Sequence, residues 1–128
     1  MSNNQNIRPG YAYRTIVYTK NNDSISLIDK HEGGAEIPLD PWLGTVVMLA
    51  DGQHTIQELI DNLGNKYPNG VPANFENTIN SVIKRLLDSG VIKISAEPVD
   101  LVYYLSIPWE EQDQQKSKKL MEIDNYLL

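Results

Sequence analysis

The chain has 128 residues, of which 41% are hydrophobic, and its formal net charge is −6 at pH 7. This length and apolar content suit a compact folded domain rather than a disordered chain. Cysteine is absent from the sequence, which excludes disulfides, thiolate metal sites and a cysteine nucleophile. Acidic residues outnumber basic ones in every part of the chain, so no basic face for binding nucleic acid is expected.

Residues 1–10 are polar and lack the basic start and apolar run of a secretory signal. No later stretch reaches about 18 continuous apolar residues, the length typical of a membrane span. We therefore expect no membrane association and a cytoplasmic location.

The first forty residues have the composition of β-strands. Residues 12–19 are rich in β-branched and aromatic side chains, and residues 24–29 alternate between polar and apolar before Ile28. A third short strand is predicted over residues 35–39, after a turn at residues 32–34. Because proline has no N–H to donate to a ladder, Pro38 predicts that this strand lies at a sheet edge.

Helical signals begin at Asp40, a favourable N-cap that is followed by proline. The first helix is expected to end at residues 51–52. A second begins with the capping box formed by Thr55 and Glu58. A third runs from about Asn74 to a glycine C-cap at residue 90. Its apolar positions recur with a helical period: Phe75, Ile79, Val82, Ile83, Leu86 and Leu87.

After the third helix, residues 91–95 and 101–106 are predicted to form a hairpin. Residues 109–128 then suggest a helix with a thin apolar stripe. The sequence therefore predicts an α+β fold: a small three-stranded antiparallel sheet, a three-helix winged helix-turn-helix-like bundle, and a C-terminal hairpin and helix. Residues 1–95 would form the main domain and residues 96–128 an extension.

Several short motifs occur in a consistent order along the chain. They are Arg8-Pro9-Gly10, Glu32-Gly33, Leu49-Ala50-Asp51-Gly52, Thr55, Glu58-Leu59 and Leu86–Ile92. In this order and spacing, residues 7–94 resemble the PqqD-like family, also called RiPP recognition elements (RiPP meaning ribosomally synthesised and post-translationally modified peptide). The chain departs from the family pattern at Pro38, which removes one backbone donor, and in the residues after Ile94.

The resemblance implies a domain without catalytic activity or cofactor that captures the leader of a precursor peptide as an added strand. A separate modifying enzyme, in this family often a radical S-adenosylmethionine protein, would then act on the peptide. Strand pairing is expected at Ala35, Glu36 and Ile37. The groove wall is expected on the third helix at Asn80, Ile83, Lys84 and Leu87, with Lys84 and Arg85 available for an acidic leader.

The residues themselves give little support to catalysis. His31 and His54 lie in predicted turns, and neither has the spacing of a metal ligand. Glu110 and Glu111 are neighbours, so on a helix their carboxylates point to different sides. No catalytic residue, metal site or cofactor is therefore predicted.

Two alternatives remain open from the sequence. A winged-helix DNA-binding regulator would use the third helix for reading, but its first turns offer Asn74, Glu76 and Asn77 rather than cations. The stripe at Leu120, Ile123 and Leu127 could pack on the body of the protein, on the modifying enzyme, or on a second copy as a homodimer.

Overall fold

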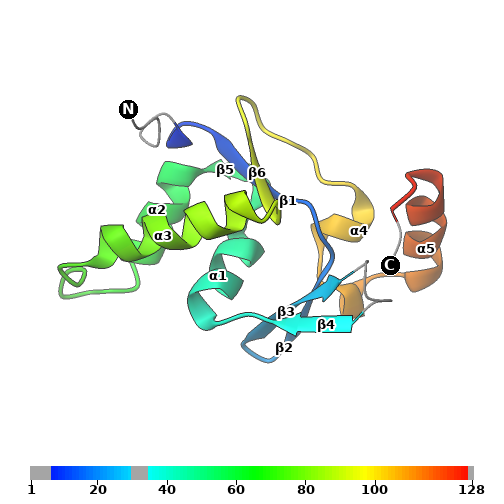
Figure 1. Ribbon diagram of the computed structural model, residues 1–128, viewed down its shortest axis with the longest axis horizontal. Helices are drawn as coiled ribbons and strands as arrows, with labels where there is room; N and C mark the ends of the chain where they lie inside the picture. Colours follow the sequence, from blue (N-terminus) through cyan, green and yellow to red (C-terminus); the bar gives the residue numbers. More distant parts are fainter. Residues whose placement is uncertain (1–6, 30–34, 127–128) are drawn as a thin grey trace.

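The computed structural model describes residues 7–29 and 35–126 (Figure 1). Within these ranges the fold is α+β, as predicted, with two small three-stranded antiparallel sheets. The elements are β1 (Tyr11–Arg14), β2 (Tyr18–Asn21), β3 (Ser24–Asp29), β4 (Ala35–Pro38), α1 (Pro41–Leu49), β5 (Asp51–Thr55), α2 (Ile56–Gly64), α3 (Phe75–Asp88), β6 (Ile92–Ser95), α4 (Tyr103–Ser106), the 3-10 turn η3 (Trp109–Glu111) and α5 (Gln114–Ile123). None of these helices is long and apolar enough to cross a membrane.

The first sheet has the order β5-β1-β6, with both neighbours antiparallel to β1. Strand β5 was not predicted, because Asp51-Gly52 was interpreted only as the end of a helix. Gly52 adopts a φ of 83°, and a Cβ at this position would meet the carbonyl oxygen of Val99. The backbone at the start of β5 therefore depends on glycine.

The second sheet has the order β2-β3-β4. The prediction of one strand over residues 12–19 is wrong, because this segment contributes β1 and β2 to different sheets. Between them the backbone bonds to other partners: Thr15 N–H donates to the carbonyl of Val91, and Val17 N–H donates to the hydroxyl of Tyr126. A run of β-forming residues does not reveal such a change of partner.

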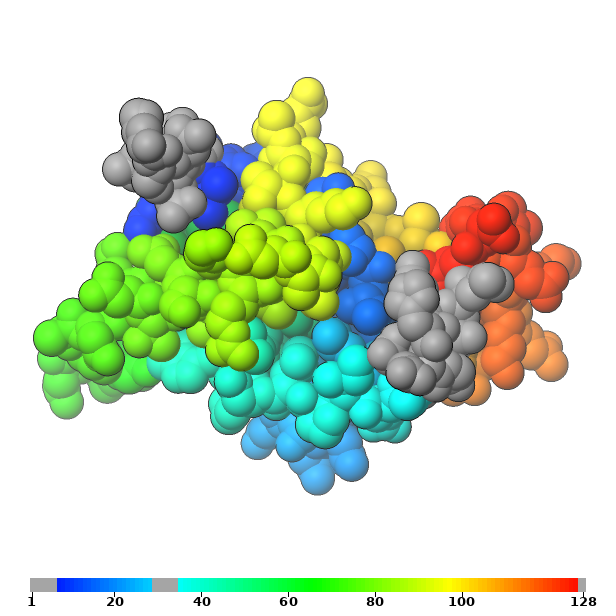
Figure 2. Space-filling model, viewed as in Figure 1, coloured from blue at the N-terminus to red at the C-terminus, as the bar shows by residue number. Residues whose placement is uncertain are grey.

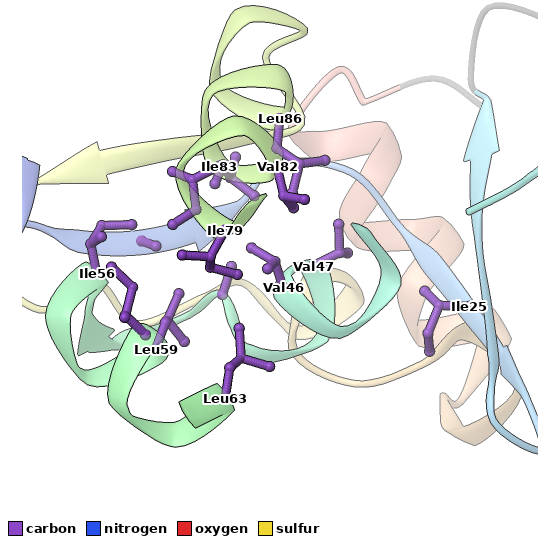
Figure 3. Packing of buried hydrophobic residues seen from close by; sticks show 14 of the residues in the cluster. Ile25, Val46, Val47, Ile56, Leu59, Leu63, Ile79, Val82, Ile83 and Leu86 are labelled. Atoms are coloured by element: carbon purple, nitrogen blue, oxygen red, sulfur yellow. The ribbon is translucent and has the colours of Figure 1, made fainter. Parts of the chain in front are cut away.

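The three predicted helices and their caps are confirmed. Asp40 Oδ1 accepts from the Leu43 N–H at 2.8 Å, and Pro41 is the first residue of α1. Thr55 and Glu58 form the reciprocal capping box of α2. Gly90 follows α3 with a φ of 78°. In Figure 3 the buried side chains of α1, α2 and α3 point toward one another and form the main core.

The predicted C-terminal hairpin is wrong. Strand β6 pairs with β1, and residues 103–106 form the short helix α4 rather than a returning strand. The intervening loop bonds to β5, where Val99 N–H donates to the Gly52 carbonyl at 2.8 Å. The last helix, α5, is also shorter than the predicted range of 109–128 and lies at the end of the molecule opposite the α2–α3 connection (Figure 1).

Strand β3 is covered on both faces of its sheet. Ile25 and Leu27 belong to the main core, whereas Ile28 belongs to a second buried cluster with Val17, Tyr104 and Met121. Through Met121 in this cluster, the C-terminal helix α5 packs on the body of the same chain. Leu120 lies beside this cluster, Ile123 is 72% exposed, and Leu127 lies outside the described residues.

The C-terminal extension is anchored by the buried guanidinium of Arg14, which is 1% exposed. It donates to the carbonyls of Leu105 and Ser106 in α4, at 2.7 and 2.9 Å. It also donates to three carbonyls at the end of α1, those of Val47, Met48 and Ala50. Burial lowers the pKa of Arg14, and the Tyr18 ring lies 4.6 Å from its guanidinium carbon. A single side chain thus joins α1 to residues 96–128.

Candidate functional site

The two edges of the sheet β2-β3-β4 differ in what covers them. At the β2 edge, Lys20 N–H donates to Oε1 of Glu110 at 2.8 Å. Just before β2, Val17 N–H donates to the Tyr126 hydroxyl at 3.0 Å. The C-terminal extension therefore satisfies backbone donors along this edge, which would otherwise be able to pair with another strand.

The β4 edge is open within the described part of the chain. There, β4 pairs with β3 alone, and all four of its residues are exposed. Leu39 N–H donates to the Ile25 carbonyl at 3.0 Å. Since hydrogen-bonded and non-hydrogen-bonded pairs alternate along antiparallel strands, Ile37 also bonds toward β3, and the backbone groups of Glu36 and Pro38 face outward. The expected edge position of Pro38 is confirmed, and its nitrogen sits where no ladder bond to β3 is lost.

The side chains of β4 alternate between the two faces of the sheet. Ile37 lies opposite Leu27, so its side chain is on the face that packs against α1. It is 40% exposed. Glu36 lies opposite Ile28, so its carboxylate is on the face covered by the C-terminal extension. A strand added to β4 would have its side chains divided between these two environments in the same way.

A hollow of about 380 Å³ lies between α3 and the start of α1, and one of its lining residues, Asp40, follows the end of β4 by two residues. We refer to it as the α1–α3 hollow. Its lining residues are Asp40, Trp42, Asn74, Asn77, Thr78, Ser81, Val82 and Arg85. Figure 2 shows α3 and the neighbouring cyan residues of β4 and α1 exposed on one face of the molecule. Residues of β4, α1 and α3 are therefore accessible from the same side.

The predicted strand residues Ala35, Glu36 and Ile37 lie together on the open edge. The predicted helix residues Asn80, Lys84 and Leu87 line another hollow of about 220 Å³, together with Ile7, Arg8, Ile56 and Asp88. Ile83 is 1% exposed and belongs to the main core. The structure thus places the predicted helix residues either in the core or on the flank of α3 away from the α1–α3 hollow.

The sequence could not choose between the two flanks of α3. The core stripe of this helix is Ile79, Val82, Ile83 and Leu86. One flank carries residues 80, 84 and 87, and the other carries residues 78, 81 and 85, so the apolar period is compatible with either. The structure has a hollow beside each flank, and the α1–α3 hollow is lined by Thr78, Ser81 and Val82, which were not among the predicted residues.

The cations of the two flanks differ in their pairing. Lys84 Nζ pairs with Asp88 at 2.8 Å, and Arg8 pairs with Glu76 at 2.9 Å and donates to Gln57. By contrast, the Arg85 guanidinium has no ion pair or hydrogen bond with any residue that the structure describes. Arg85 is therefore the cation available at the α1–α3 hollow.

Outside this region, the side chains of His54 and Tyr104 each have a partner within the chain. His54 Nδ1 lies 3.0 Å from Asp51 Oδ1, and both side chains are on the surface. Over residues 7–29 and 35–126, no three His, Cys, Asp or Glu side chains are grouped so that they could hold a metal ion. Tyr104 donates to Asp124 at 2.9 Å, and burial together with this bond raises the pKa of Tyr104 to about 12. Searches against protein-family models, curated proteins and solved structures gave no match to the chain.

Proposed function

We propose that the chain binds the leader region of a ribosomally made precursor peptide as an additional strand on β4 and presents it to a separate modifying enzyme. The observation that carries the proposal is the open β4 edge beside the α1–α3 hollow, on a sheet whose other edge is covered. Strand addition uses such an edge for backbone hydrogen bonds and an adjacent groove for side-chain selection.

The backbone of β4 gives a bound segment few hydrogen bonds. Between residues 35 and 38 the outward groups are the N–H and carbonyl of Glu36 and the carbonyl of Pro38. Because proline supplies no donor, side chains in the α1–α3 hollow must contribute much of the affinity. On β4 itself, the exposed side chain of Ile37 offers an apolar contact, and in the hollow Arg85 provides a charge for an acidic leader residue.

We infer that the arrangement of α1, α2 and α3 with β5 and β6 is of the winged-helix type found in PqqD-like domains. The motifs that suggested this family have structural roles that support the inference. Gly52 adopts positive φ at the start of β5, Thr55 and Glu58 cap α2, and Gly90 follows α3 with positive φ. The chain would act as a recognition subunit without chemistry of its own, and the enzyme that it serves could be a radical S-adenosylmethionine protein.

The proposal is tested by calorimetric titration of the full chain with synthetic leader peptides encoded beside its gene. We expect a one-to-one complex of micromolar affinity or tighter, with amide NMR shifts along β4 and at Asn77, Ser81 and Arg85. Shifts confined to the hollow lined by Ile7 and Lys84 would place the site on the other flank of α3. Absence of peptide binding, together with salt-sensitive binding to upstream DNA, would instead support the winged-helix regulator.

A further inference from the structure

We propose that Glu36 makes the peptide site selective for a segment that places lysine or arginine directly opposite it. The inference rests on the proposed strand addition to β4, and it names the chemistry of the segment that binds there. It is carried by the register of β4 and by the charge and exposure of Glu36.

The register fixes which residue of an incoming segment meets Glu36. Glu36 is the β4 residue that presents both an N–H and a carbonyl to the open edge. A strand that uses both groups must set one residue opposite Glu36, whether it runs parallel or antiparallel to β4. Because residues in opposing positions project to the same face, that residue's side chain lies beside the Glu36 carboxylate, on the face of Ile28.

The charge of Glu36 is not compensated within the described part of the chain. The Glu36 carboxylate forms no ion pair or side-chain hydrogen bond with any residue that the structure describes, and Glu36 is exposed. Opposing Cβ atoms lie about 4.5–5.5 Å apart, within easy reach of a lysine or arginine head group. An acidic residue at the same position would meet a like charge and weaken binding.

The neighbours of the selected residue face the other side of the sheet. They project on the face of Ile37, which is the face of the sheet that packs against α1. Apolar residues are favoured next to Ile37. The bound segment is therefore expected to contain three consecutive residues of apolar, basic and apolar type. Any acidic residue is expected farther along the segment, where it can reach Arg85.

A second copy of this chain is a poor occupant of the edge. The two-fold pairing in which each Glu36 N–H bonds to the other chain's Glu36 carbonyl also sets the two carboxylates opposite each other. Like charges in opposing positions are destabilising. In addition, Pro38 deprives a paired copy of one donor on each side. The edge thus disfavours its own copy and favours a segment of opposite charge.

In the test, a displayed library of random 12-residue peptides is selected for binding to three forms of the full chain. These are the natural sequence, Glu36→Lys, and the charge-matched control Glu97→Lys, whose substitution lies in an exposed loop. We expect the natural chain and the control to enrich one basic position between apolar residues, and Glu36→Lys to enrich an acidic residue there. In titrations of one selected peptide, exchanging lysine for glutamate at that position should weaken binding to the natural chain about five-fold and strengthen binding to Glu36→Lys.

The outcomes separate this inference from the proposed function. If selected peptides shift the amides of β4 but all three forms choose the same charge, Glu36 does not set specificity and strand addition survives. If the selected peptides shift amides elsewhere, or none is enriched, both the inference and the proposed strand addition are refuted.

Discussion

Replacement of Arg14 by methionine tests whether residues 96–128 are part of the same cooperative unit as the main domain. The guanidinium donates to five backbone carbonyls, two in α4 and three at the end of α1. Methionine fills a similar apolar volume but cannot donate. The substitution therefore removes the bonds and leaves most of the packing of the side-chain stem.

The expected loss of stability follows from what each carbonyl retains. The Ala50 carbonyl still accepts from the Arg14 backbone N–H, and the Val47 carbonyl still accepts from Ala50 N–H. The carbonyls of Met48, Leu105 and Ser106 each accept a hydrogen bond from the Arg14 guanidinium, and the variant removes it. An unpaired buried acceptor costs about 1–3 kcal/mol, and these three are partly buried, so we expect a loss of about 2–4 kcal/mol.

The assay is urea denaturation combined with hydrogen exchange of the natural chain and Arg14→Met. Exchange should accelerate in both α1 and α4, because one side chain serves both. The matched control is Arg8→Met, which removes a surface ion pair with Glu76 and should change stability by at most about 1 kcal/mol. A loss below about 1 kcal/mol in Arg14→Met, or faster exchange in α4 alone, would refute the reasoning.

Three further predictions concern other parts of the molecule. Gly52→Ala should destabilise the fold by about 2–3 kcal/mol in thermal or urea unfolding, because alanine is strained at a φ of 83° and its Cβ meets the Val99 carbonyl; an effect below about 1 kcal/mol would contradict this. Ile37→Asp should weaken leader binding at least about tenfold in calorimetry while stability changes by less than about 1 kcal/mol, since the side chain is 40% exposed; unchanged affinity would exclude the β4 face. The pKa of Tyr104 is raised to about 12 from its ordinary value near 10, so the folded state holds this proton more tightly than the unfolded state. The stability that this difference contributes is lost as pH rises from about 10 to 12. Tyr104→Phe should make the free energy of unfolding fall less steeply over that pH range, and an unchanged slope would show that Tyr104 does not cause the decline.

Local signals in the sequence predicted the elements whose cause is also local. Caps at Asp40 and Thr55, the glycine after α3 and the proline at a sheet edge each depend on a few neighbouring residues. For the same reason the α+β class and the three main helices could be predicted. The open edge at residues 35–37 followed from Pro38 together with the resemblance to PqqD-like domains.

Features that depend on distant partners could not be predicted. The break between β1 and β2 arises because Thr15 bonds to Val91 and Val17 bonds to Tyr126, far along the chain. Strand β5 exists because β1 pairs with it, although its sequence, Asp-Gly-Gln-His-Thr, has low β-propensity. The flank of α3 beside the candidate site is set by where α1 packs, and the periodicity of α3 does not contain that information.

The most direct test of strand addition is to measure hydrogen exchange at the Glu36 amide by NMR. The full chain is measured with and without a leader peptide that is encoded beside the gene for this chain. This amide faces the open edge, so it should exchange freely in the unbound chain and become protected when a peptide strand pairs with β4. The Ile37 amide, which bonds toward β3, provides an internal control. Protection of Glu36 on binding would support the account, whereas saturating peptide that leaves the Glu36 amide unprotected would contradict it.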